Sequence, residues 1–142
     1  AGCQVVVMGS GSAQTYTGKP CTEVTVDVNA DQVSVSDFDG IVIPGGYAPD
    51  KMRRFPKMVK IVKDLHEAGK VVAAICHAGW MLASAEILQG KSVTSVSAIK
   101  DDLVHAGAVW VDQEVVVDGN MITSRTPDDL PAFMRAIIHA LK

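Results

Sequence analysis

The sequence has little charge, no long apolar run and few cysteines, and each shortage argues against a class of protein. Only 20% of the 142 residues are charged, the net charge is −3 and no block of Lys and Arg occurs, which argues against a nucleic-acid-binding module. The longest apolar run covers six residues, 71–76, whereas a membrane span needs about 20. Cys3, Cys21 and Cys76 form no Cys-x-x-Cys pair, so we expect neither a disulfide framework nor a metal site.

What the chain has in quantity is hydrophobic sequence, 48% of its residues. A chain of this length buries about two-thirds of its unfolded surface, so we expect residues 1–142 to form a single domain. No leader or lipidation motif is visible, which favours a soluble, cytoplasmic protein with free thiols. The Gly- and Ser-rich segment 9–18 is not followed by a helix, so we expect no nucleotide and no other cofactor.

Patterns typical of strands and of helices alternate along the chain. We expect strands at 4–8, 22–28, 40–43, 71–75, 93–95, 109–111, 114–118 and 121–123. We expect helices at 50–68, 77–88 and 98–106, ended by Gly69, Gly90 and Gly107, and a last helix from Pro127. The turn at 118–120 predicts a hairpin. This alternation indicates a three-layer α/β/α fold of flavodoxin-like character, with a mostly parallel sheet and a β-hairpin near one edge.

One buried strand ends in a Cys from which a helix is expected to start, in the run 71–79. This strand-turn-helix pattern is typical of a nucleophile elbow, here with Cys76 in place of Ser. The N–H groups of the helix start stabilise a thiolate, and His77 is placed to act as a base or as a neighbouring cation. Backbone amides of His77 and of Gly45 or Gly46 are candidates for an oxyanion hole. A Cys in an apolar run is as often a small core residue, so spacing alone leaves both interpretations open.

Several blocks in order resemble a known family. The chain is similar to the PfpI-type intracellular peptidases of the DJ/PfpI superfamily, which have a class I glutamine-amidotransferase-like fold. The blocks that carry the resemblance are Ile-Pro-Gly-Gly-Tyr-Ala-Pro-Asp at 43–50, Ala-Ile-Cys-His at 74–77, Ile-Lys-Asp-Asp at 99–102, Trp-Val-Asp at 110–112 and Val-Val-Val-Asp-Gly-Asn at 115–120.

The resemblance implies roles for five residues. It implies that Cys76 is the nucleophile, that His77 is its partner and that Gly45 or Gly46 lies in the oxyanion hole. It also implies that Asp50 orients His77 from a neighbouring subunit of a homo-oligomer. Three positions depart from the family pattern: Asp50 stands where Glu is typical, the dipeptide at 78–79 replaces Gly-Pro, and Val96 replaces a Tyr near the site.

The resemblance also implies an opening strand and helix, about 20–25 residues that carry a Glu beside the thiol and would precede Ala1. We therefore expect the chain to be incomplete at its N-terminus relative to the family.

The expected activity is attack of Cys76 on a small carbonyl compound or a peptide. The reaction is either peptide or amide hydrolysis, or glyoxalase or deglycase action on methylglyoxal and its adducts. The alternatives are a stress protein, redox-sensing or chaperone-like, with an oxidisable Cys76, and an inactive domain stabilised by subunit contacts.

Structural rather than functional roles are expected for several other residues. We expect Cys3 and Cys21 to be packing residues, and Trp80 and Trp110 to be core or interface aromatics. We expect His66 to be solvated. Asp128 and Asp129 are expected to act through the positive end of the last helix.

Overall fold

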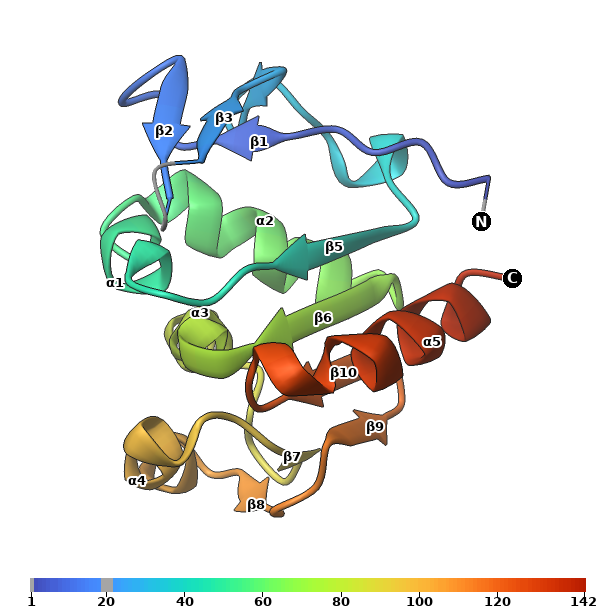
Figure 1. Cartoon of the computed structure of the whole chain (residues 1–142). Coiled ribbons are helices and arrows are strands. Elements are labelled where there is room, and N and C mark those ends of the chain that lie inside the picture. The colour runs from blue at the N-terminus through green and yellow to red at the C-terminus, as the bar shows by residue number, and fades with distance from the viewer. Residues whose placement is uncertain (1, 19–21) are drawn as a thin grey trace.

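The computed structural model describes residues 2–18 and 22–142 (Figure 1). Its strands are β1 (Met8–Gly9), β2 (Thr15–Thr17), β3 (Glu23–Thr25), β4 (Val28–Asn29), β5 (Gly40–Ile43), β6 (Val71–Ile75), β7 (Ser92–Val93), β8 (Val109–Trp110), β9 (Val115–Asp118) and β10 (Met121–Ser124). Its helices are α1 (Ala48–Met52), α2 (Pro56–Glu67), α3 (Gly79–Ser84), α4 (Lys100–His105) and α5 (Leu130–Ala140), with 3₁₀ turns η1 (Val35–Asp37), η2 (Cys76–Ala78), η3 (Ser97–Ile99) and η4 (Pro127–Asp129). In these described ranges no helix has both the length and the apolar character that crossing a bilayer requires.

The centre of the fold is a four-stranded sheet with the order β5-β6-β10-β9. β6 runs parallel to both of its neighbours, and β9 is antiparallel to β10 at the edge. The turn between β9 and β10 contains Gly119, whose φ of +61° suits a residue without Cβ. The predicted mostly parallel sheet and its edge hairpin are confirmed.

Alternate side chains of β6 point into two separate cores, which creates the three layers. Val72 and Ala74 pack with the core residues of α2 and α3 on one face. Val71 and Ala73 pack with Phe133 of α5 on the other face. All five residues of β6 are buried, as expected for a strand covered on both sides. The α/β/α prediction is confirmed, and Figure 1 shows α5 and α3 on opposite sides of the sheet.

The N-terminal part forms its own small sheets. β1 pairs with β4 in parallel, and β2 pairs with β3 as an antiparallel ribbon, so the Gly- and Ser-rich segment 9–18, to which no strand was assigned from the sequence, contains β2. The strand expected at 4–8 is limited to Met8–Gly9. β5 is the last strand of the central sheet on this side, and Val42 is 50% exposed. The N-terminal strands therefore do not continue the sheet that carries the core.

Two predicted helices are shorter than expected because of backbone chemistry at their ends. The single helix expected at 50–68 is two helices, since Pro56 has no N–H and holds Phe55 in an extended conformation. The helix expected at 77–88 begins as a 3₁₀ turn and ends at Ser84. Glu86, with φ +59°, takes up the left-handed conformation just beyond this end, and Gly90, with φ +73°, follows further along the chain. Gly69 and Gly107 follow helix ends with positive φ, as predicted.

Candidate functional site

Cys76 lies at the carboxyl end of the central strand in a strained backbone conformation. The chain is extended up to Ile75 and then enters η2 at Cys76, whose φ is +62°. This left-handed conformation costs a non-glycine residue about 1–2 kcal/mol. Strain of this kind is typical of a nucleophile elbow, because the sharp turn lifts the side chain out of the sheet. Although β6 is buried throughout, Cys76 itself is only half-buried.

His77 is in reach of the Cys76 sulfur. Nδ1 of the imidazole lies 3.4 Å from Sγ, within hydrogen-bonding distance for sulfur, and the tautomer decides which atom donates. Both side chains are half-buried, so the pair is open to solvent on one side. The thiol can pass its proton to the imidazole and become a thiolate.

The first glycine of the turn after β5 packs against this pair. A Cβ on Gly45 would lie 2.6 Å from Cβ of Cys76 and 3.0 Å from the Ile75 carbonyl oxygen. Only glycine therefore fits at position 45 without a shift of the elbow. Gly46 faces open space, but its φ of +68° again favours glycine. The structure thus brings Gly45 to the thiol, and a substrate carbonyl on Cys76 would be close to this turn.

Asp50 lies on α1, which packs against η2. Its carboxylate accepts a 2.7 Å ion-paired hydrogen bond from Arg54 and is 27% exposed. Among the contacts of the described residues, this carboxylate is paired with Arg54 and not with His77. Within one chain, therefore, the structure brings Cys76, His77 and Gly45 together and leaves Asp50 with another partner.

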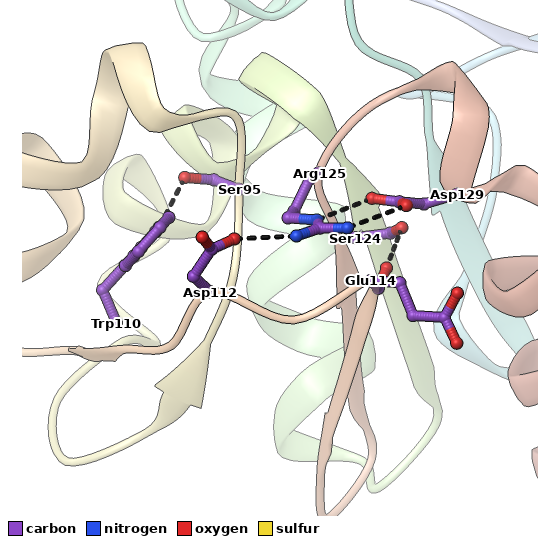
Figure 2. A network of polar contacts seen from close by, with 7 residues as sticks. All are labelled: Ser95, Trp110, Asp112, Glu114, Ser124, Arg125 and Asp129. Atoms are coloured by element: carbon purple, nitrogen blue, oxygen red, sulfur yellow. Dashed lines mark hydrogen bonds and ion pairs between the residues drawn. The ribbon is translucent and has the colours of Figure 1, made fainter.

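A second polar cluster, not predicted from the sequence, lies at the same edge of the sheet (Figure 2). Arg125 donates from Nε and Nη2 to the two carboxylate oxygens of Asp129, at 2.8 and 3.1 Å, and from Nη1 to Asp112 at 2.8 Å. Ser124 pairs with Ile75 in the β10–β6 register, so this cluster and Cys76 follow neighbouring strand ends.

The ion pairs of this cluster shift the pKa values of Arg125 and Asp129. The hydrogen bonds from Arg125 lower the pKa of Asp129, and the two carboxylates raise the pKa of Arg125. Asp129 was expected to act through the helix dipole, but it is buried and bound to Arg125 instead. The Arg-x-x-x-Asp spacing at a helix start is the one sequence signal that pointed to this pair.

Other expectations for single residues are corrected by the structure. Cys3 is exposed rather than packed, and Cys21 lies outside the described residues. His66 is half-buried, its Nδ1 is buried without a hydrogen-bond partner, and burial together with the nearby Lys91 lowers its pKa. It is not the solvated residue that was expected.

Two hollows on the described surface lie away from the thiol. One of about 390 Å³ is bordered by Arg53, Lys63 and Ser84, and one of about 150 Å³ lies near Asp31 and Lys57. Cys76 lines neither of them. The described residues also contain no group of three His, Cys, Asp or Glu side chains arranged to hold a metal ion.

Comparison with known proteins places these features in context. The family described as DJ-1/PfpI matches residues 1–140. A deglycase of Pyrococcus horikoshii is 46% identical over 137 residues, which cover 96% of this chain and 82% of the relative. General stress protein 18 of Bacillus subtilis is 42% identical over 144 residues, covering 100% of this chain and 84% of the relative.

The likeness extends to a solved structure. A two-domain protein of Anabaena variabilis, with a DJ-1/ThiJ/PfpI-like and a ferritin-like domain, matches with a TM-score of 0.96 and 45% identity. The match covers 99% of this chain and 42% of that one.

Proposed function

The chain belongs to the DJ-1/PfpI family and is a stress-related cysteine enzyme of the PfpI type, and on that premise we propose that Cys76 is its nucleophile and that it attacks an electrophilic carbonyl carbon. The observation that carries this proposal is the strained Cys76, at φ +62°, with Nδ1 of His77 3.4 Å from its sulfur. Backbone strain at a half-exposed thiol beside a base is typical of functional sites.

The proposed chemistry uses the groups around the thiol. His77 accepts the proton of Cys76, Sγ forms a bond to the carbonyl carbon, and the carbonyl π electrons move to oxygen. The Gly45–Gly46 turn and the His77 amide then face the oxyanion, which takes up the proton from His77. With a peptide or amide, His77 gives this proton to the leaving nitrogen instead of to the oxyanion, the C–N bond breaks as the carbonyl re-forms, and the amine departs from an acyl-enzyme that water hydrolyses.

The deglycase names of relatives favour small dicarbonyl compounds and their adducts as substrates. With methylglyoxal, addition of the thiol gives a hemithioacetal, a proton shift between the two carbons gives a thioester, and water releases a hydroxy acid and the thiol. No oxidant is consumed.

We expect the complete site to form in a homo-oligomer. Asp50 is bound to Arg54 in the single chain, but the pair is exposed, and an exposed ion pair is worth at most about 1 kcal/mol. The His77 of a partner subunit can therefore compete for this carboxylate at small cost. The proposal also includes a cytoplasmic location, where reducing conditions keep Cys76 as a free thiol.

Activity assays on three proteins test the nucleophile. Consumption of methylglyoxal, release of a glycated amine and cleavage of an unmodified peptide are measured for the wild type, Cys76→Ala and Cys3→Ser. We expect Cys76→Ala to lose at least about a thousandfold in rate, because no other group forms the covalent bond. Cys3→Ser is the matched control and should keep the wild-type rate. Activity that survives Cys76→Ala, or no activity of any kind in the wild type, would refute the proposal and leave the redox-sensing interpretation.

Mixing two inactive variants tests the subunit-crossing role of Asp50. Cys76→Ala and Asp50→Asn subunits are combined and allowed to exchange. If Asp50 acts across a dimer interface, each mixed dimer holds one complete site, and random exchange restores about a quarter of the wild-type activity. No recovery on mixing, in a sample shown by light scattering to exchange subunits, would contradict a role in the partner's site.

A further inference from the structure

The imidazole of His77 has a second neighbour besides the thiol. Trp80 lies three residues further along, on the same face of the turn formed by η2 and α3. Its ring centroid is 5.2 Å from that of His77 and the planes are tilted by 59°. Tilted aromatic pairs at this distance attract each other, so the position of Trp80 restricts the rotation of the His77 ring.

Trp80 is itself fixed by two contacts from different elements. Its Nε1–H donates a 2.8 Å hydrogen bond to Asp102 of α4. The guanidinium of Arg53, at the end of α1, lies 5.7 Å from the Trp80 ring centroid, within range of a cation–π contact. Arg53 in turn donates from Nε to the hydroxyl of Ser84 at 2.9 Å. The indole is therefore held by α1 and by α4 while it contacts His77.

We propose that Trp80 is a positioning residue, which holds the His77 imidazole with Nδ1 toward the Cys76 sulfur, and that Asp102 and Arg53 hold Trp80 in this place. The inference rests on the proposed Cys76–His77 pair. The physical reason is rotational freedom: a half-exposed imidazole without a fixed neighbour visits other rotamers, in which Nδ1 leaves the sulfur. A tryptophan anchored at both its N–H and its ring face removes those rotamers.

The chain provides a matched control for this tryptophan. Trp110 also donates from Nε1, to Ser95 at 3.0 Å, and also carries a cation over its ring, Lys100 at 5.1 Å. It has the same kinds of contact as Trp80, but the aromatic contact with His77 belongs to Trp80 alone among the described residues. A change at Trp110 therefore measures the general cost of losing an anchored indole.

Alkylation of the thiol tests the proposal without any assumption about substrate. In a Cys3→Ser, Cys21→Ser background, the rate of reaction with iodoacetamide is measured from pH 6 to 9, with thermal unfolding as a check of the fold. We expect Trp80→Ala to slow alkylation near neutral pH about two- to tenfold, and to move the pH profile toward that of His77→Ala. In the His77→Ala background, Trp80→Ala should add nothing. Trp110→Ala and Trp110→Phe, the controls for Trp80→Ala and Trp80→Phe, should keep the wild-type profile.

Smaller changes keep the test decisive if Trp80→Ala fails to fold. Trp80→Phe retains the ring against His77 but loses the hydrogen bond to Asp102, and Asp102→Asn weakens that bond from an exposed position. Each should slow alkylation by about twofold, and the double variant should be no slower than Trp80→Phe. Wild-type profiles for both would overturn the inference, as would an equal effect of Trp80→Ala with and without His77.

The outcomes also separate the inference from the proposed function. If His77→Ala leaves the alkylation profile unchanged, the Cys76–His77 pair fails and the role of Trp80 fails with it. If His77→Ala changes the profile and Trp80→Ala does not, the pair stands and only the positioning role is lost.

Discussion

The Cys76 site and the Arg125 cluster are two corners of one sheet edge, and they differ in how their polar groups are paired. At the end of β6, Cys76 is strained and its sulfur has one polar neighbour, His77, at 3.4 Å. At the end of the neighbouring strand β10, Arg125 donates three hydrogen bonds to two carboxylates (Figure 2). Among the described contacts, the reactive thiol of the first corner has one side-chain hydrogen bond, whereas the guanidinium of the second is bound to two carboxylates.

The difference teaches how the fold supports a strained nucleophile. Backbone strain persists only where the surroundings over-determine the conformation. Here β6 is buried on both faces, pairs with β5 over residues 71–74 and pairs with β10 over residues 72–75, so Cys76 cannot relax by moving the strand. The Arg125 cluster ties the chain after β10 to the start of α5 and holds the adjacent strand end in place. Changes at the first corner, at the second, and at a site away from both test whether the two corners behave independently.

The largest effect is expected from Gly45→Ala. The new methyl group would lie 2.6 Å from Cβ of Cys76, so the elbow or the turn must move. Overpacking at a rigid site costs about 2 kcal/mol, and we expect alkylation of Cys76 to change with it. Gly46→Ala is the control: its methyl group meets open space, but the φ of +68° costs about 1 kcal/mol. Chemical denaturation and alkylation rates measure both, and equal behaviour of the two variants would contradict close packing of Gly45.

The second effect concerns the other corner. Asp129→Asn removes the charge that Arg125 binds, and we expect a thermal midpoint lower by about 3–6 °C at neutral pH. Cys76 alkylation should change little, because no hydrogen bond links the two corners among the described contacts. The exposed neighbour serves as control, and Asp128→Asn should leave the midpoint unchanged. A midpoint unaffected by Asp129→Asn would show that the cluster does not stabilise the fold.

The ion pair of Arg125 and Asp129 also predicts how the stability of the fold decreases at low pH. Arg125 lowers the pKa of Asp129 below its ordinary value of 3.8. The stabilisation by the folded-state carboxylate is therefore fully present above 3.8 and is lost as the pH falls through the lower folded-state value. Unfolding curves of the wild type and Asp129→Asn should converge below pH 3.8. A constant difference between the two proteins down to pH 2 would contradict this linkage.

The smallest effect on stability is expected from His66, near the amino-terminal ends of the strands. Burial and Lys91 lower the pKa of His66 below 6.5, so the folded state favours the neutral imidazole. The stability that this provides is present above pH 6.5 and declines as the pH falls through the lower folded-state value. His66→Gln should flatten the stability profile in that window and leave both corners unchanged. His139→Gln, at an exposed position, is the control, and an identical slope in both variants would exclude His66 as its source.

Local patterns in the sequence predicted two central strands of the sheet and the elbow that follows one of them. The strands at 40–43 and 71–75 have the bounds that were expected, because continuous apolar runs ended by Gly or by a Cys-His step leave few alternatives. The elbow at Cys76 followed from the same run. The break at Pro56 could also have been predicted, since proline cannot continue a hydrogen-bonded helix, but the apolar stripe that follows it was extended back to residue 50 as one helix.

What the sequence by itself determined is therefore the order of elements, the two faces of β6 and the place of the thiol at a strand end, since each depends on neighbours within a few residues. Only the tertiary structure decided which groups meet across long separations. It set Gly45 against Cys76, Arg125 between Asp112 and Asp129, and Trp80 between Asp102 and Arg53. Such contacts depend on sheet order and helix packing, and short-range periodicity contains no information about either.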